Sequence, residues 1–197
     1  MYGKTILGRR ARAGAVVLSL VLLLVTGCPE PEEPVVEDVV LLSSVGCDAC
    51  GGDCSLESFQ VNTRIHVDEE VDYLYLPPVG GRHDRCWAPY GVHEQELAAR
   101  NWVHNLEHGA VVLLYNCPDG CDDEVAVLSS VAASMAPSTV IVSPYSDMEA
   151  RFAAVAWGWR MLLGCADEAA TFVSFYTDHF AQAPETTTAG PSQECME

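Results

Sequence analysis

Residues 102–115, with the sequence WVHNLEHGAVVLLY, contain the strongest indication of the fold in this chain. The residues before them, 94–101, are rich in helix formers. Gly109 is the usual residue for leaving a helix through a left-handed turn, and the apolar, β-branched run after it is typical of a buried strand. We therefore expect a helix that ends near His108, followed directly by a strand of the core.

His104 and His108 are four residues apart on the last turn of this expected helix, with Glu107 beside them. Positions i and i+4 are neighbours on a helix surface, so two imidazoles at this spacing are able to share one metal ion. The alternative is that they cap the helix C-terminus, where cationic and donor side chains are favoured. The pair by itself leaves both interpretations open.

The N-terminus has the features of an export signal. Positively charged residues precede a short apolar segment, 15–25, which is too short for a comfortable transmembrane helix. Val25-Thr26-Gly27-Cys28 resembles the lipobox of bacterial lipoproteins, in which the cysteine becomes the lipidated first residue of the mature protein. We therefore predict a signal peptide over residues 1–27 and a protein that is lipid-anchored through Cys28 in the cell envelope of a bacterium, at the periplasmic face or outer membrane. A retained membrane anchor is the alternative.

The expected mature chain is strongly acidic. The whole chain has 10 Lys and Arg residues against 28 Asp and Glu residues, and residues 1–27 contain four of the basic residues and none of the acidic ones. Their removal changes the formal net charge from −18 to −22 and leaves no lysine. Such a chain repels nucleic acid and gains nothing from anionic lipid, whereas cations are drawn to it. The expected partners are a metal ion, and the membrane through the lipid anchor only; no nucleic acid is expected, and no protein partner is indicated.

The rest of the chain predicts one domain of mixed secondary structure. Residues 28–42 form an acidic, Pro-rich tether, residues 43–184 a single compact globular domain, and residues 185–197 a C-terminal tail. Strand patterns occur at residues 59–66, 71–76 and 139–142, and helical spacing at residues 122–135, 148–163 and 167–180. The predicted fold class is α+β (mixed α/β), with a small sheet packed by helices.

Two blocks, LPPVGGRHDRCWAPYGVHEQ at residues 76–95 and NWVHNLEHGAVVLLY at residues 101–115, resemble an uncharacterised bacterial family, domain of unknown function 3105. Its members carry a PPxxGxH loop, a GxY-type step and an HxLEHG block. The chain departs from this pattern at His93, where members usually have Tyr, and at Cys86, which lies a few positions before the usual cysteine. The family has no established activity, so the resemblance implies candidate residues and no reaction. The resemblance also includes Arg64-Ile65-His66-Val67, and the histidines that it singles out are His66, His83, His104 and His108.

Eight cysteines remain besides Cys28, and an even number in an exported chain favours disulfides. A redox pair at Cys47-xx-Cys50 and a thiolate metal site are the alternatives. The resemblance implies a bridge between Cys86 and Cys195, because members often carry one cysteine near the GxY step and one in the C-terminal tail. The other expected pairs are Cys117 with Cys121, and Cys165 with one of Cys47, Cys50 and Cys54.

Histidines from three separate segments therefore define the candidate site. Neutral imidazole suits copper and zinc, and Glu107 is expected either to bind the metal or to orient a ligating ring. We predict a metal site made of His66, His83, His104, His108 and Glu107, in a protein that binds copper or zinc without turnover.

Two alternative functions stay open. His104-xx-Glu107-His108 matches the HxxEH pattern of inverted zincins, in which the glutamate is the general base for a zinc-bound water. An enzyme of that kind is not favoured, because Gly109 and the strand end the helix at once. The second alternative is a metal-free interaction module of the envelope, with the histidines as a structural hydrogen-bonded cluster. His93 and His179 lie off the matching motif positions and are not expected to take part.

Overall fold

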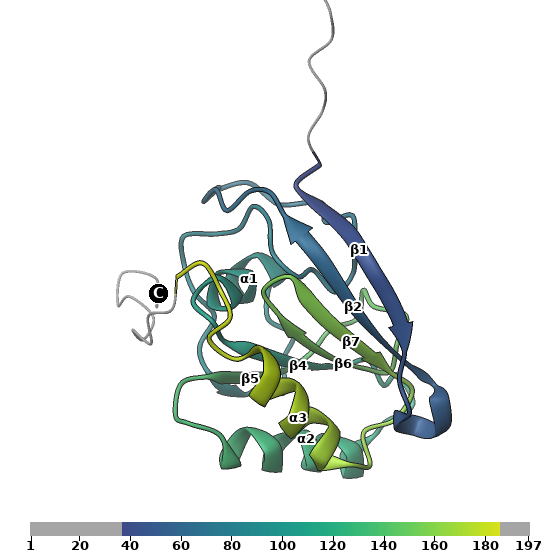
Figure 1. Cartoon of the computed structure of the whole chain (residues 1–197). Helices are drawn as coiled ribbons and strands as arrows, with labels where there is room; N and C mark the ends of the chain where they lie inside the picture. The colour runs from purple at the N-terminus through teal and green to yellow at the C-terminus, as the bar shows by residue number, and fades with distance from the viewer. Residues whose placement is uncertain (1–36, 186–197) are drawn as a thin grey trace, which may run out of the picture. The chain divides into compact units, whose positions relative to one another are not determined.

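The structure is a computed structural model, and it describes residues 37–185. These residues belong to one compact unit that contains a seven-stranded mixed sheet, three α-helices and a short 3-10 helix (Figure 1). The strands are β1 (Val39–Gly46), β2 (Cys54–Val61), β3 (Gly91–Val92), β4 (Val111–Tyr115), β5 (Val140–Pro144), β6 (Phe152–Ala156) and β7 (Trp159–Leu163), in the sheet order β1-β2-β7-β6-β4-β5-β3. The helices are η1 (Ala49–Gly52), α1 (Ala99–Glu107), α2 (Asp122–Ser134) and α3 (Ala169–His179). The predicted α+β class and the single domain are confirmed.

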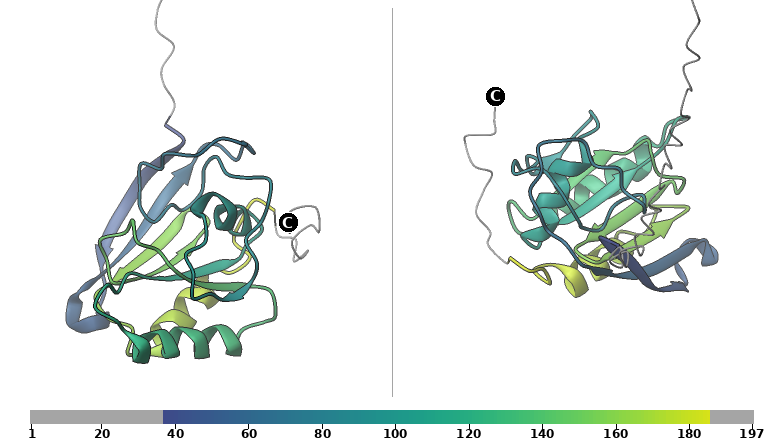
Figure 2. Two further views of the ribbon diagram at one scale, coloured as in Figure 1. Left: turned by 180° about the vertical axis from the view of Figure 1, so that it is seen from behind. Right: turned by 90° about the horizontal axis from the view of Figure 1, so that it is seen from above.

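Strand β4 leads the chain from α1 into the interior of the sheet. It pairs antiparallel with β6 and parallel with β5, so the sheet changes direction beside it. Val111 and Leu113 pack in the core cluster that includes α2 and α3, whereas Val112 and Leu114 pack in the cluster that includes α1. Figures 1 and 2 show α2 and α3 side by side on one face of the sheet and α1 on the other. Because both faces of β4 are covered, all of its side chains facing the core are apolar.

The predicted helix over residues 148–163 is wrong. This segment forms the antiparallel hairpin of β6 and β7, which turns at Gly158 with a φ of +74°. Every residue of β6 is buried, so its sequence lacks the alternation of a half-exposed strand. A short, continuous apolar run of this kind cannot be assigned to helix or strand from periodicity alone.

The predicted strand over residues 71–76 is also wrong, although its alternation has a structural origin. Tyr73 and Tyr75 pack against the core cluster that contains α1, whereas Leu74 is 70% exposed. The segment therefore lies on the core as a loop with bends at residues 74–77, and among the described residues it does not join the sheet. Strand β2 ends at Val61, so residues 62–66 of the strand predicted over 59–66 form a loop.

The domain begins earlier than predicted, because β1 starts at Val39 and the last four residues of the expected tether are part of the sheet. The predicted signal peptide and Cys28 lie outside the described residues. Within residues 37–185, no helix is both long enough and apolar enough to span a membrane.

Three disulfides are described: Cys47–Cys54, Cys50–Cys165 and Cys117–Cys121. Cys47 and Cys50 bond to different cysteines, an arrangement that differs from a CxxC redox pair. Cys195 lies outside the described residues, so its bridge to Cys86 stays a prediction.

Candidate metal centre

Two loops and one helix end bring the candidate residues together. Residues around His66 and His83 run alongside each other as an isolated parallel bridge. The amide of Val67 donates to the carbonyl of His83 at 2.8 Å, and the amide of His83 donates to the carbonyl of Ile65 at 3.1 Å. Helix α1 supplies His104 and Glu107 from its last turn. The loop that follows His83 is tied to this helix by Asn105, which exchanges two hydrogen bonds with the backbone of Ala88, at 2.8 and 3.0 Å.

His83 is fully buried and is held at both ring nitrogens. Nδ1 lies 2.8 Å from the carbonyl oxygen of Gly81, and Nε2 lies 3.0 Å from Oε2 of Glu107. Gly81 has a φ of +107°, a conformation that L side chains rarely adopt, so glycine allows the carbonyl to turn back onto the ring. The PPxxGxH loop thus orients the imidazole through its own backbone.

His104, like His83, has a partner at each ring nitrogen. Its Nδ1 lies 2.8 Å from the carbonyl oxygen of Asp84, and its Nε2 lies 3.1 Å from Nε2 of His108. Burial lowers the pKa of His104 from 6.5 to about 4, although the hydrogen bond to Asp84 acts in the opposite direction. The ring is therefore neutral at physiological pH.

The two backbone contacts determine which ring nitrogens have lone pairs. A carbonyl oxygen only accepts, so Nδ1 of His83 and Nδ1 of His104 must carry the protons. In the neutral rings, both Nε2 atoms are then unprotonated and able to bind a metal. A backbone carbonyl that receives the other ring N–H is the usual support of a metal-binding histidine.

Glu107 provides a buried carboxylate between these rings. Its Oε2 lies 3.0 Å from Nε2 of His83 and 3.7 Å from Nε2 of His66, and its Oε1 lies 3.8 Å from Arg64. Burial acts to raise the pKa of Glu107, but the hydrogen bond with His83 and the nearby imidazoles outweigh it and lower the pKa. The carboxylate is therefore ionised, and it faces an Nε2 atom that has a lone pair when His83 is neutral. Nε2 of His83 and Oε2 of Glu107 are thus a pair of donor atoms for a cation.

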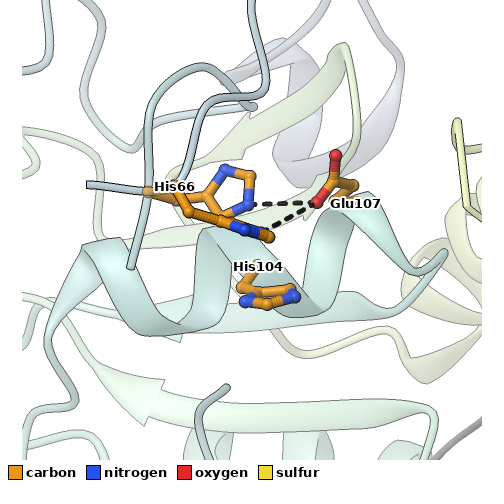
Figure 3. A group of neighbouring side chains, drawn as sticks. His66, His104 and Glu107 are labelled. Atoms are coloured by element: carbon orange, nitrogen blue, oxygen red, sulfur yellow. Dashed lines mark hydrogen bonds and ion pairs between the residues drawn. The ribbon is translucent and has the colours of Figure 1, made fainter. Parts of the chain in front are cut away.

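His66 completes the group from the solvent side. Its ring stacks on that of His104 with 4.7 Å between centroids, and its side chain is 48% exposed. Figure 3 shows His66 above His104, with Glu107 to one side. One donor atom from each of His66, His83, His104 and Glu107 lies within 4.8 Å of the others. This set of four is hereafter called the inner group.

His108, which the sequence predicts as a fifth ligand, lies beside the inner group. It directly follows α1 as the C-cap residue, and its ring stacks on Trp87 with 4.2 Å between centroids. Its Nε2 lies 3.8 Å from Oε2 of Glu185. Donor atoms of Glu107, His108 and Glu185 also lie within 4.8 Å of one another, and this second set is called the outer group.

Several contributing residues were missed by sequence reasoning. The sequence predicts Glu185 as part of the C-terminal tail, and nothing in its local sequence indicates that it returns to α1. Asn105 had a detectable signal, because it is a polar residue among the buried positions of the helix. Arg64 and Asp84 lie close to His66 and His83 in the sequence, but only folding shows that each contacts this site.

Comparison with known proteins identifies the family of this chain. No curated protein and no solved structure matches the chain. The family described as "Protein of unknown function (DUF3105)" matches residues 65–192, a span that includes both the inner and the outer group. The chain belongs to the DUF3105 family of proteins of unknown function.

Proposed function

We propose that this protein binds a transition-metal ion, copper(II) or zinc, through the inner group and holds it without turnover. We further propose that it is exported and lipid-anchored through Cys28 in a bacterial cell envelope. The sequence pattern at residues 1–28 supports the second part, and the geometry of the inner group supports the first.

The observation that supports metal binding most directly is the direction of the ring nitrogens. Nδ1 of His83 and Nδ1 of His104 each donate to a backbone carbonyl, at 2.8 Å in both cases. Nε2 of His83 therefore faces the carboxylate of Glu107, and Nε2 of His104 faces His108, while one donor atom of each of the four residues lies within 4.8 Å of the others. Three imidazoles and a carboxylate are donors that suit zinc and copper(II), whereas calcium and magnesium prefer oxygen ligands alone.

The group must contract to hold one ion. Donors at about 2.1 Å from a tetrahedral zinc ion are separated by about 3.4 Å. The four donor atoms lie within 4.8 Å of one another. His66 is half-exposed, so it is the ligand with most freedom to move inward. The acidic character of the chain favours the approach of cations.

The hydrolase alternative has less support from the geometry. An HxxEH enzyme needs His104 and His108 on one zinc ion, with Glu107 directed at a bound water. Here Nε2 of His104 and Nε2 of His108 are 3.1 Å apart, as such an enzyme requires, but Glu107 is itself among the donors of the inner group, with its Oε2 3.0 Å from Nε2 of His83. Replacing Glu107 with Gln separates the two functions. A binding protein should lose affinity modestly, whereas a hydrolase should keep its zinc and lose peptide hydrolysis.

The test is a metal titration of the full-length protein, purified in detergent without a histidine tag and stripped with a chelator. We expect at least one tightly held zinc or copper(II) ion per chain, and a rise in unfolding free energy of about 2.7 kcal/mol at 100 times the dissociation constant. His83→Ala should abolish this ion, and His179→Ala is the matched control that should retain it. Absence of binding of both metals at micromolar concentration near pH 7 would refute the proposal and favour a structural histidine cluster.

A further inference from the structure

We propose that the outer group binds a second divalent cation, so that Glu107 bridges two metal ions. This inference rests on the proposed function, because it adds an ion beside the inner one. Its ligands would be Glu107, His108 and Glu185, which offer one imidazole nitrogen and two carboxylate oxygens within 4.8 Å of one another.

The two oxygens of Glu107 are directed at different neighbours. Oε2 is the oxygen near His83 and His66, at 3.0 and 3.7 Å. Oε1 is the oxygen near the guanidinium of Arg64, at 3.8 Å, and the same guanidinium nitrogen lies 3.0 Å from Oε1 of Glu185. A carboxylate with one oxygen toward each of two ligand groups has the arrangement of a bridging ligand.

Glu185 is held in place by the backbone. Its amide donates to the carbonyl of Glu107 at 3.0 Å, and the amide of Ala181 donates to the carbonyl of Gly109 at 2.9 Å. Gly109 permits this close approach, because a Cβ at that position would lie 2.8 Å from the Cα of Ala181. The segment 181–185 is thus attached across the end of α1, which distinguishes Glu185 from an acidic side chain that is merely exposed.

Arg64 already provides one positive charge at this position. Its guanidinium pairs with both carboxylates of the outer group, and its side chain is 53% exposed. Arg64 also borders a surface pocket of about 410 Å³, together with Ile65 and Pro184. The guanidinium therefore has space to move aside, and a divalent ion would compensate the two carboxylates more fully than a single charge does.

Each ion would take one of the two histidines at the end of α1, the inner ion His104 and the outer ion His108. Nε2 of His104 and Nε2 of His108 are 3.1 Å apart. Metal ions in two-metal sites are about 3.5–4 Å apart, and the two donor sets place His104 with the inner ion and His108 with the outer one. The outer ion has fewer imidazole ligands and a more exposed carboxylate, Glu185, which is 46% exposed. We therefore expect it to be the weaker of the two.

The experiment measures zinc stoichiometry on the full-length protein by titration and by metal content after gel filtration. Wild type should bind two ions per chain with different affinities. His108→Gln and Glu185→Gln should each bind one, with the tighter affinity unchanged within about threefold. Glu69→Gln, which removes an exposed carboxylate outside the group, should still bind two. Arg64→Gln should bind the second ion more tightly.

A magnetic measurement separates this site from adventitious binding to the acidic surface. Two copper(II) ions bridged by one carboxylate should couple, so the intensity of the electron paramagnetic resonance signal should fall below that of two isolated ions and recover in Glu185→Gln. One ion per chain in wild type, or two uncoupled ions that persist in Glu185→Gln, would overturn the inference and leave the inner site standing. No ion at all would overturn the proposed function as well.

Discussion

Nε2 of His104 lies 3.1 Å from Nε2 of His108, and the direction of this contact follows from the other nitrogen of His104. Because Nδ1 of His104 donates to the carbonyl of Asp84, its Nε2 accepts in the neutral ring. His108 therefore donates when no metal is bound. A metal on His104 removes this acceptor, so loading of the inner group should change the hydrogen bonding of His108.

The ligands of the inner group should differ in importance. His83→Ala and His104→Ala should each weaken binding of the tighter ion by more than about 100-fold. Removing a ligand costs more affinity than removing a side chain that only supports a ligand, which costs about 10- to 100-fold. His66→Ala should weaken it by about tenfold, because this side chain is half-exposed and must move to reach the ion. His93→Ala and His179→Ala should change affinity less than twofold. Isothermal titration measures these values, and equal losses across all five variants would contradict the assignment.

The metal-free protein should lose stability in mild acid because of His104. Burial lowers its pKa from 6.5 to about 4, so between these values the unfolded chain binds more protons than the folded one. The free energy of unfolding then rises with pH. The contribution is fully present above pH 6.5 and is lost as the pH falls toward 4, by up to about 2 kcal/mol between pH 7 and pH 5.

Urea unfolding at these two pH values, in the presence of a chelator, measures this loss. His104→Gln should show a smaller difference between pH 7 and pH 5 than wild type does. If His104→Gln lost as much stability between pH 7 and pH 5 as wild type, the acid sensitivity would come from other groups. His108 and His179 are two such groups, because burial lowers their pKa values as well.

Gly109→Ala should destabilise the domain more than Gly120→Ala does. Both glycines have left-handed backbones, with φ values of +88° and +89°. A Cβ at Gly120 would meet nothing within 4 Å, whereas a Cβ at Gly109 would meet Ala181 at 2.8 Å. Gly120→Ala should therefore cost about 1 kcal/mol for the backbone alone, and Gly109→Ala about 1–3 kcal/mol more for the clash. Thermal unfolding of both variants is the measurement, and equal losses would contradict the packing of the segment 181–185.

The disulfides should differ in their contribution to stability according to the loops that they close. Cys50–Cys165 has a sequence separation of 115 and Cys117–Cys121 one of 4. In the loop-entropy model, removal of the first should cost about 5 kcal/mol and removal of the second about 2 kcal/mol. Paired Cys→Ser variants and denaturant unfolding test this order.

A non-reducing peptide map of the same protein tests the predicted bridge between Cys86 and Cys195. The expected result is a linked peptide pair that contains both cysteines. If each were found joined to another cysteine, or free, the pairing implied by the family resemblance would be wrong.

Lipidation should depend on Cys28 alone. A fatty acid carrying an alkyne tag, supplied to bacteria expressing the full chain, should label the protein and partition it with membranes. Cys28→Ala should abolish the label, and the double variant Cys117→Ala/Cys121→Ala is the control that should retain it. Unchanged labelling in Cys28→Ala would refute the lipoprotein prediction.

The sequence by itself determined the features that depend on neighbours along the chain. The helix end at Gly109, the strand that follows it and the position of His104 and Glu107 on the last turn are local, because glycine conformation and helical spacing act over a few residues. Helices α2 and α3 were predicted for the same reason, since each keeps an apolar stripe on one face.

Only the tertiary structure decided which of these residues meet. The bridge between the segments of His66 and His83, the return of Glu185 to α1 and the division of the histidines into two groups depend on backbone pairing between distant segments. The hairpin of β6 and β7 was hidden for a related reason, because burial of both faces removes the alternation that marks a strand. The directions of the imidazole nitrogens depend on the carbonyls of Gly81 and Asp84, and a backbone oxygen leaves no trace in the residue types.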